Sequence, residues 1–148
     1  MVQFFCPSCW VEVAETNSRC PQCGVEIESF WDRRDFVEKL IQALRHPESQ
    51  TPVRAAWLLG QLGDPRAVGP LVDTVRRTTD VFLGRAVVEA LGRIDSDEAR
   101  VFLLTLIDHP VRMIADEAQK AVNHEGLDGF SGSGSRSLDQ ETSGESYD

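Results

Sequence analysis

Four cysteines carry the clearest chemistry in this sequence, and all four lie within its first 23 residues. They form two Cys-x-x-Cys pairs, Cys6 with Cys9 and Cys20 with Cys23. Two intervening residues let each pair close a tight turn around one cation, and the segment between the pairs is long enough for a hairpin that brings the turns together. The spacing therefore predicts a four-thiolate metal site, for which zinc is the expected ion.

A site of this kind holds structure and does not perform chemistry. Four protein sulfurs leave no coordination position open for water or a substrate. Iron also accepts four thiolates, so the spacing does not decide between zinc and iron. The alternative is a pair of disulfides or a redox-active cysteine pair. The doubled motif, the lack of a surrounding βαβ pattern and the lack of a secretion signal argue against that alternative.

The residues that follow each cysteine pair indicate a small β structure. Residues 10–13 and 25–28 alternate apolar and polar side chains, which is the period of short strands. With the knuckles Cys6-Pro7-Ser8-Cys9 and Cys20-Pro21-Gln22-Cys23-Gly24, the region resembles zinc ribbons of the CPxC type. Trp10 stands where the first knuckle lacks the usual glycine. We expect residues 1–30 to form a zinc ribbon that depends on its metal for stability.

The next segment, residues 31–124, has helical periodicity. Apolar residues recur on one face of each turn, while prolines and capping residues punctuate the pattern. We expect helices over roughly 32–46, 52–63, 65–78, 81–94, 97–108 and 110–123. The expected N-caps are Thr51, Asp64, Asp80 and either Ser96 or Asp97. Pro70 lies too deep in its helix to be free of cost, so we expect a short or irregular first turn there.

An internal repeat runs through these helices. Leu59-Gly60-Gln61-Leu62-Gly63-Asp64 matches Leu91-Gly92-Arg93-Ile94-Asp95-Ser96 at an offset of 32 positions, and His-Pro dipeptides lie 63 positions apart. This pattern, clearest over residues 53–68 and 85–92, resembles HEAT repeats of the short PBS-lyase type. The resemblance implies an all-α fold, a short HEAT-like α-solenoid of about three helical hairpins behind the ribbon. Glycine inside a helix is unfavourable, so Gly60 and Gly92 predict close contact between helices.

Charge is distributed unevenly along the chain, whose net charge is −9. Residues 1–30 carry four glutamates and one arginine, residues 31–124 are nearly neutral, and residues 125–148 carry six acidic residues and one arginine. This balance argues against sequence-independent nucleic-acid binding, which needs a basic surface. The Gly/Ser-rich acidic tail, 125–148, is expected to be disordered. It either solubilises the chain or acts as a tethered acidic peptide that binds a partner.

The sequence offers no catalytic constellation. The histidines, His46, His109 and His124, lie at expected helix ends, where loop or capping roles explain them. The cysteines are committed to the metal, so no thiol remains for covalent catalysis. Some proteins with this repeat type are lyases that attach bilin chromophores. A lyase, or an accessory subunit of a chromophore- or cofactor-modifying enzyme, is therefore the alternative function, as is nucleic-acid binding through the ribbon.

The second helix of each hairpin lines the inner face of such solenoids, and five residues there are candidates for partner binding: Trp57, Gln61, Glu89, Arg93 and Glu117. In the repeat register Trp57 aligns with Glu89 and Glu117, so an aromatic side chain occupies a frame that is otherwise polar. Tryptophan often dominates binding energy, which makes Trp57 a candidate anchor. The competing and favoured placement packs Trp57 beneath the ribbon or against the first helix.

These observations predict a protein-binding adaptor or scaffold without catalytic activity. The inner face and the ribbon would together contact another protein, and the cofactor would be one structural zinc. The N-terminus has no signal-peptide pattern, and no apolar stretch approaches the length of a membrane span. We therefore expect a cytoplasmic protein that is a monomer outside its complex. The sequence does not identify the partner.

Overall fold

The computed structural model describes residues 2–128, with side chains through Asn123. Its N-terminal ribbon begins with two antiparallel strands, β1 (Phe4–Phe5) and β2 (Glu12–Val13), in which Phe4 lies opposite Val13. Further along, an isolated bridge joins Arg19 and Glu26, and α1 (Ile27–Phe30) follows at once. The strand expected over residues 25–28 is therefore wrong. Glu26 stands at the N-cap of α1 and Glu28 falls in its first turn, where acidic side chains favour a helix.

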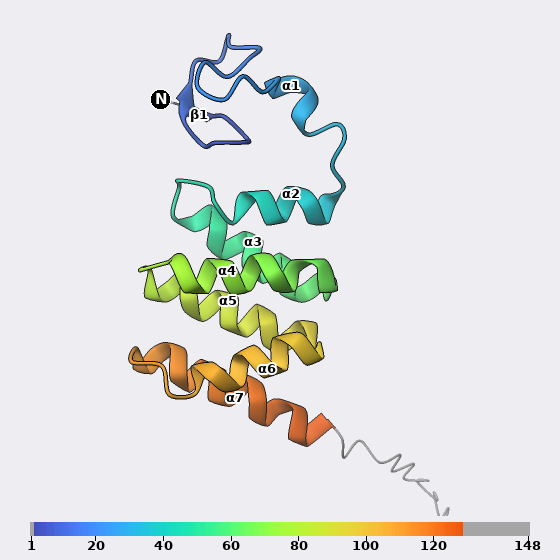
Figure 1. Cartoon of the computed structure of the whole chain (residues 1–148), viewed down its shortest axis with the longest axis vertical. Helices are drawn as coiled ribbons and strands as arrows, with labels where there is room; N and C mark the ends of the chain where they lie inside the picture. Colours follow the sequence, from blue (N-terminus) through green and yellow to red (C-terminus); the bar gives the residue numbers. More distant parts are fainter. Residues whose placement is uncertain (1, 129–148) are drawn as a thin grey trace, which may run out of the picture.

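Behind the ribbon, the described part of the chain forms three helical hairpins stacked along one axis (Figure 1). The hairpins pair α2 (Phe36–Ala43) with α3 (Gln50–Leu62), α4 (Val68–Arg77) with α5 (Val81–Ile94), and α6 (Asp97–Leu106) with α7 (Arg112–Asp128). Helices α3, α5 and α7 pack on one another in series, and α2, α4 and α6 form the other layer. The predicted all-α solenoid is confirmed. We call the exposed side of α3, α5 and α7 the inner face.

The apolar core lies between the two helical layers and runs the length of the stack. Leu59 of α3, Leu71 of α4, Leu91 of α5 and Leu103 of α6 are among its fully buried side chains. Burial of each such leucine stabilises the fold by about 1.5–3 kcal/mol. Because every hairpin contributes to this single core, the hairpins support one another, as expected of a repeat protein.

Two glycines set the spacing within the α3, α5 and α7 layer. A Cβ atom placed on Gly60 would lie 2.8 Å from the Cα atom of Ala90, and one placed on Gly92 would lie 2.8 Å from the Cβ atom of Ala121. The same contact thus recurs between α3 and α5 and between α5 and α7. Both distances are too short for a real side chain, so the close approach predicted for Gly60 and Gly92 is confirmed.

Short polar side chains begin most of the helices as predicted. Asp64 accepts a hydrogen bond from the backbone N–H of the 3₁₀ turn that precedes α4, while Asp80 and Ser96 accept from the first turns of α5 and α6. The N-cap expected at Thr51 is wrong. Helix α3 begins at Gln50, and the carboxylate of Glu48 accepts hydrogen bonds from the N–H groups of both Gln50 and Thr51. A glutamate reaching forward from the preceding turn thus replaces the expected threonine cap.

Three helix boundaries differ from those predicted or are irregular. Helix α2 begins at Phe36 because Asp35 caps it, and α4 is preceded by a 3₁₀ turn, η1 (Pro65–Ala67), which places Pro70 at the third residue of α4. The irregular turn expected near Pro70 is therefore confirmed. Helix α7 begins at Arg112 and continues to Asp128. Position 124 thus lies within the helix and not at its end. The disordered tail predicted from residue 125 is wrong for residues 125–128, which belong to α7, and its remainder, 129–148, lies outside the described residues.

Candidate metal centre and inner helical face

The four cysteines converge in one cluster within the ribbon. Their sulfur atoms all lie within 4.8 Å of one another, with Cys6 Sγ 3.6 Å from Cys23 Sγ and Cys9 Sγ 3.7 Å from Cys20 Sγ. Four sulfurs held tetrahedrally at the zinc–sulfur bond length would be separated by about 3.8 Å. The donor set and its spacing therefore fit a four-thiolate metal ion, and each knuckle supplies one buried and one more accessible ligand.

Both knuckles use the same backbone hydrogen bonds. The N–H of Cys6 donates to Val11 and its carbonyl accepts from Trp10, each at 2.9 Å, and Cys20 makes the equivalent pair of bonds with the backbone of residues 24 and 25. The residue that closes each turn has a positive φ, 60° at Trp10 and 74° at Gly24. Trp10 thus adopts the left-handed conformation that glycine supplies in the second knuckle, although L side chains adopt it reluctantly.

The cluster requires a cation before all four sulfurs can be charged. The backbone N–H groups of Cys23 and Gln22 stabilise the Cys20 thiolate and lower its pKa to about 6. The backbone N–H of Val11 acts to lower the pKa of Cys9, but desolvation and the neighbouring thiols outweigh it and raise that pKa to about 12. Four adjacent thiolates repel one another, so binding of a divalent ion would release protons from the cluster.

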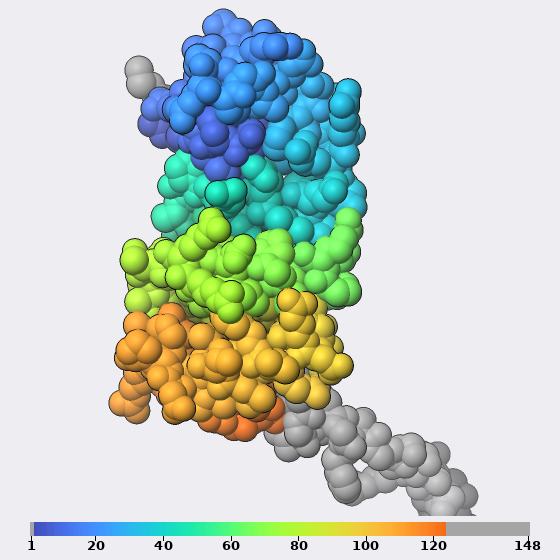
Figure 2. All heavy atoms as spheres, in the orientation of Figure 1, coloured from blue at the N-terminus to red at the C-terminus, as the bar shows by residue number. Residues whose placement is uncertain are grey.

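The first knuckle docks on α2 and on the turn that follows it. The Nε2 atom of Gln42 donates to the Pro7 carbonyl at 2.6 Å and lies 3.4 Å from the Ser8 carbonyl. The ring of His46 packs edge-on against Phe5 and Trp10, with centroid separations of 5.4 and 4.7 Å. In Figure 2 the atoms of the ribbon rest directly on this end of the solenoid.

The two His-Pro dipeptides have the turn role predicted for them. The Nδ1 atom of His46 accepts a hydrogen bond from the N–H of Glu48 at 3.0 Å, and that of His109 accepts from the N–H of Val111 at 3.1 Å. Each histidine thus closes the turn around its proline, and His46 also packs against the ribbon. Sequence reasoning missed Gln42, because nothing in its spacing marks it as a partner of the first knuckle.

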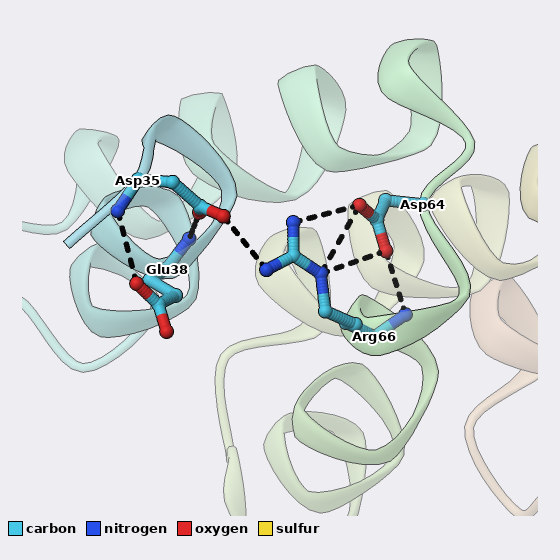
Figure 3. A network of polar contacts seen from close by, with 4 residues as sticks. All are labelled: Asp35, Glu38, Asp64 and Arg66. Atoms are coloured by element: carbon cyan, nitrogen blue, oxygen red, sulfur yellow. Dashed lines mark hydrogen bonds and ion pairs between the residues drawn. The ribbon is translucent and has the colours of Figure 1, made fainter.

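A network of hydrogen bonds and ion pairs connects the first two hairpins (Figure 3). Asp35 and Glu38 form a capping box at the start of α2. The guanidinium of Arg66 lies 2.7 Å from a carboxylate oxygen of Asp35 and 2.9 Å from one of Asp64. The backbone N–H of Glu38, then Arg66, lowers the pKa of Asp35, and Arg66 is the main cause of the lowered pKa of Asp64. One arginine therefore joins the N-caps of α2 and η1.

The inner face carries the candidate partner residues. Trp57 is 53% exposed, so its expected packing beneath the ribbon is wrong. It lines a groove of about 270 Å³ between α3 and α5 together with Arg54, Glu89 and Arg93. Glu89 and Arg93 form an ion pair at 2.9 Å. Three of the five predicted residues, Trp57, Glu89 and Arg93, thus meet at one groove.

The other two predicted residues lie outside this groove. Gln61 is exposed one helical turn beyond Trp57 on α3. Glu117 lies on α7, where its carboxylate is 3.2 Å from the Arg85 guanidinium and 3.8 Å from the Lys120 ammonium group. Among the residues whose side chains are described, Arg54 has no ion-pair partner. The structure places Arg54 at the groove, where it was not among the predicted partner residues.

A solenoid of helical hairpins is the architecture of a repeat protein in which each unit packs on its neighbours. A family model described as HEAT repeats matches residues 37–123, which is more than half of the chain. The chain belongs to the HEAT-repeat family, whose repeats commonly mediate protein interactions. No curated protein matches it. Within residues 2–128, none of the helices combines the length and apolar character needed to cross a bilayer.

Proposed function

We propose that this protein is a non-catalytic adaptor that binds another protein through its inner face, with the ribbon as a metal-stabilised cap that contributes to the same surface. The observation that carries the proposal is the exposure of Trp57 at an apolar groove with charged sides. An exposed tryptophan beside arginines has the composition of an interface hot spot. The groove joins two repeats, so a partner seated there would contact α3 and α5 together.

We further propose that the ion in the ribbon is zinc and that it is structural. Tetrahedral zinc is fully coordinated by four cysteine sulfurs, which leaves no position for a reacting group. No charged side chain is buried in the part of the chain with described side chains, whereas catalytic groups are commonly desolvated and perturbed. Thiolate ligands require a reducing compartment, which favours the cytoplasm. Outside its complex the chain would be a monomer.

The test is affinity capture from the native cell with wild-type protein and with Trp57→Ala. Phe36→Ala is the matched control, because Phe36 is also an exposed aromatic, 57% accessible, but lies at the start of α2. We expect wild type and Phe36→Ala to retain the same protein and Trp57→Ala to lose it. The retained protein is then purified, and its affinity for the three chains is measured by calorimetry.

The expected loss for Trp57→Ala is at least about 2 kcal/mol, which is about thirtyfold in Kd. Equal affinity of the partner for all three chains would contradict binding through the inner face. Turnover of a substrate by the purified chain would contradict the non-catalytic assignment. Circular dichroism of each variant verifies that a lost interaction does not reflect lost folding.

A further inference from the structure

The apolar and charged residues that line the inner-face groove indicate which kind of ligand it can bind. Its lining is mostly apolar, from Val53, Trp57, Ala86 and Ala90, while Arg54 brings a guanidinium whose charge no described carboxylate neutralises. The one acidic side chain of the groove, Glu89, is already paired with Arg93. A ligand that places an apolar side chain beside a carboxylate would satisfy both features.

Through Asn123, where side chains are described, the charges on α3, α5 and α7 differ in balance from those of the chain. The exposed or partly exposed charged residues of these helices are five cations and three acids, namely Arg54, Arg85, Arg93, Arg112 and Lys120 against Glu89, Asp116 and Glu117. The chain as a whole carries a net charge of −9. All three acids lie within 4 Å of a cation on the same face. The groove therefore keeps a positive charge at Arg54 on a protein that is acidic as a whole, and it complements an acidic peptide.

The chain itself contains such a peptide immediately after α7. Residues 129–148 carry four acidic residues and one arginine, and Leu138 directly precedes Asp139. The segment departs from the last helix of the inner layer, whose Ala121 packs against Gly92 beside Arg93. It therefore leaves the fold at the end of the inner face that carries Arg93.

The length of the segment allows it to reach the groove. Packed helices lie about 8–10 Å apart, so α3 is about 20 Å from α7. Along the helix axes, Arg54 lies about 22 Å from Asp128, because Gly92 faces Ala121, Gly60 faces Ala90 and Arg54 precedes Gly60 by six residues. The straight-line separation is then about 30 Å. The ten residues between Asp128 and Asp139 can span about 33 Å when extended. The tether also gives Leu138 and Asp139 a high effective concentration at the groove.

We propose that residues 129–148 are an intramolecular ligand of the groove, with the Leu138 side chain against Trp57 and the Asp139 carboxylate on the guanidinium of Arg54. The inference rests on the proposed function, because it assigns a regulator to the same groove. The segment occupies the partner surface in the free protein, and a partner must displace it. The observation behind the proposal is the juxtaposition of an unneutralised arginine, an exposed tryptophan and an adjoining acidic segment.

The test follows the indole N–H resonance of Trp57 in the full-length, metal-loaded chain. Trp57→Phe identifies that resonance by its disappearance. A tail-neutralised chain carries Asp139→Asn, Glu141→Gln, Glu145→Gln and Asp148→Asn. We expect neutralisation to shift the Trp57 resonance and to leave those of Trp10 and Trp31 in place. Raising NaCl from about 50 to about 500 mM should move the native chain toward the neutralised one.

A second comparison assigns the effect to Arg54. In an Arg54→Glu background, neutralising the tail should no longer shift the Trp57 resonance, whereas in an Arg45→Glu background the shift should persist. Arg45 is the matched control because it is an exposed arginine in the turn after α2 and does not line the groove. A synthetic peptide of residues 129–148 should also bind the tail-neutralised chain about tenfold more tightly than the same chain with Arg54→Glu.

A Trp57 resonance that is identical in the native and tail-neutralised chains at low salt overturns the intramolecular ligand. A shift that persists undiminished with Arg54→Glu overturns it as well. The proposed function survives either result if capture of a partner protein still requires Trp57. Failure of the intramolecular ligand can therefore be distinguished from failure of the proposed function. Capture that becomes stronger after tail neutralisation is the functional outcome expected of a displaced internal ligand.

Discussion

Cys20 is the ligand whose loss should affect the metal site most directly. Its sulfur belongs to the four-sulfur cluster and also accepts hydrogen bonds from the N–H groups of Gln22 and Cys23 at 3.4 and 3.5 Å. We expect Cys20→Ser to lower bound metal from about one equivalent per chain to near zero, because a hydroxyl is a poor zinc ligand. Plasma mass spectrometry of freshly purified protein measures this. Ser18→Ala, an exposed change in the same ribbon, should retain the metal; a fully loaded Cys20→Ser chain would contradict the assignment.

Gly60 tests the close approach of α3 and α5. Gly60→Ala raises helix propensity but places a methyl group 2.8 Å from the backbone of Ala90. We expect the clash to prevail and to lower the free energy of unfolding by about 1–3 kcal/mol. Gly69→Ala, in a helix but with nothing within 4 Å of its new methyl group, should instead stabilise the fold by about 0.4–1 kcal/mol. Urea unfolding measures both, and equal effects would refute the packing role of Gly60.

Individual residues could be predicted from the sequence where a local rule determines the outcome. Asp64, Asp80 and Ser96 cap helices because short polar side chains reach the first free N–H groups wherever a helix begins. The N-cap predicted at Thr51 was wrong because the carboxylate of Glu48, three residues earlier, accepts the first free N–H groups of the helix. At Trp10 a local rule did not predict the backbone conformation. Its positive φ follows from the geometry of the knuckle, which overrides the preference of the residue.

At the scale of elements, Arg66 couples the starts of two hairpins, and this coupling should depend on pH. The pKa values of Asp35 and Asp64 are lowered in the fold, so their stabilising effect is present above about pH 4 and is lost as pH falls through the folded pKa values. We expect Arg66→Ala to lower Tm at pH 7, and the difference from wild type to shrink toward pH 3. Calorimetry across this range measures the effect.

The control for Arg66 is Arg45→Ala, which removes the same charge from a residue with no ion-pair partner among the described side chains. Its effect on Tm should be small and should not fade between pH 5 and pH 3. A difference for Arg66→Ala that is constant with pH would show that the arginine contributes packing and not ion pairs. Both Arg66 ion pairs are exposed, so their net contribution is expected to be modest.

Helices with a clear apolar periodicity could be predicted from the sequence. Contacts between residues far apart in the sequence could not. Helices α3 to α6 lie within three residues of their expected bounds because apolar period and caps agree there. The cysteine cluster could be predicted because four identical ligands at fixed spacing have one common use. The docking of the ribbon could not, because Gln42 and Pro7 are 35 positions apart and neither residue type indicates the contact.

At the scale of the whole molecule, the ribbon and the solenoid have separate sources of stability. The hydrophobic core that runs from Val37 to Ala118 contains none of the ribbon cysteines. The ribbon has two short strands and a few buried residues, so a bound metal would supply most of its folding free energy. The two parts meet through the bonds of Gln42 and the rings around His46. Metal binding should therefore control the cap and affect the repeats through this contact.

Removal of the metal by a chelator tests this separation. We expect most of the helical circular dichroism to remain, because the core between the helices is intact without the ribbon. The solenoid should nevertheless lose the hydrogen bond and ring contacts of the cap, about 1–2 kcal/mol, which corresponds to a fall in Tm of about 4–16 °C for a helical domain of this size. Gln42→Ala should lower Tm in the loaded protein and reduce the further fall on chelation, because the contact that transmits metal loss is already weakened. If the helices instead unfold together with the ribbon as metal is withdrawn, the cap is part of one cooperative unit with the repeats.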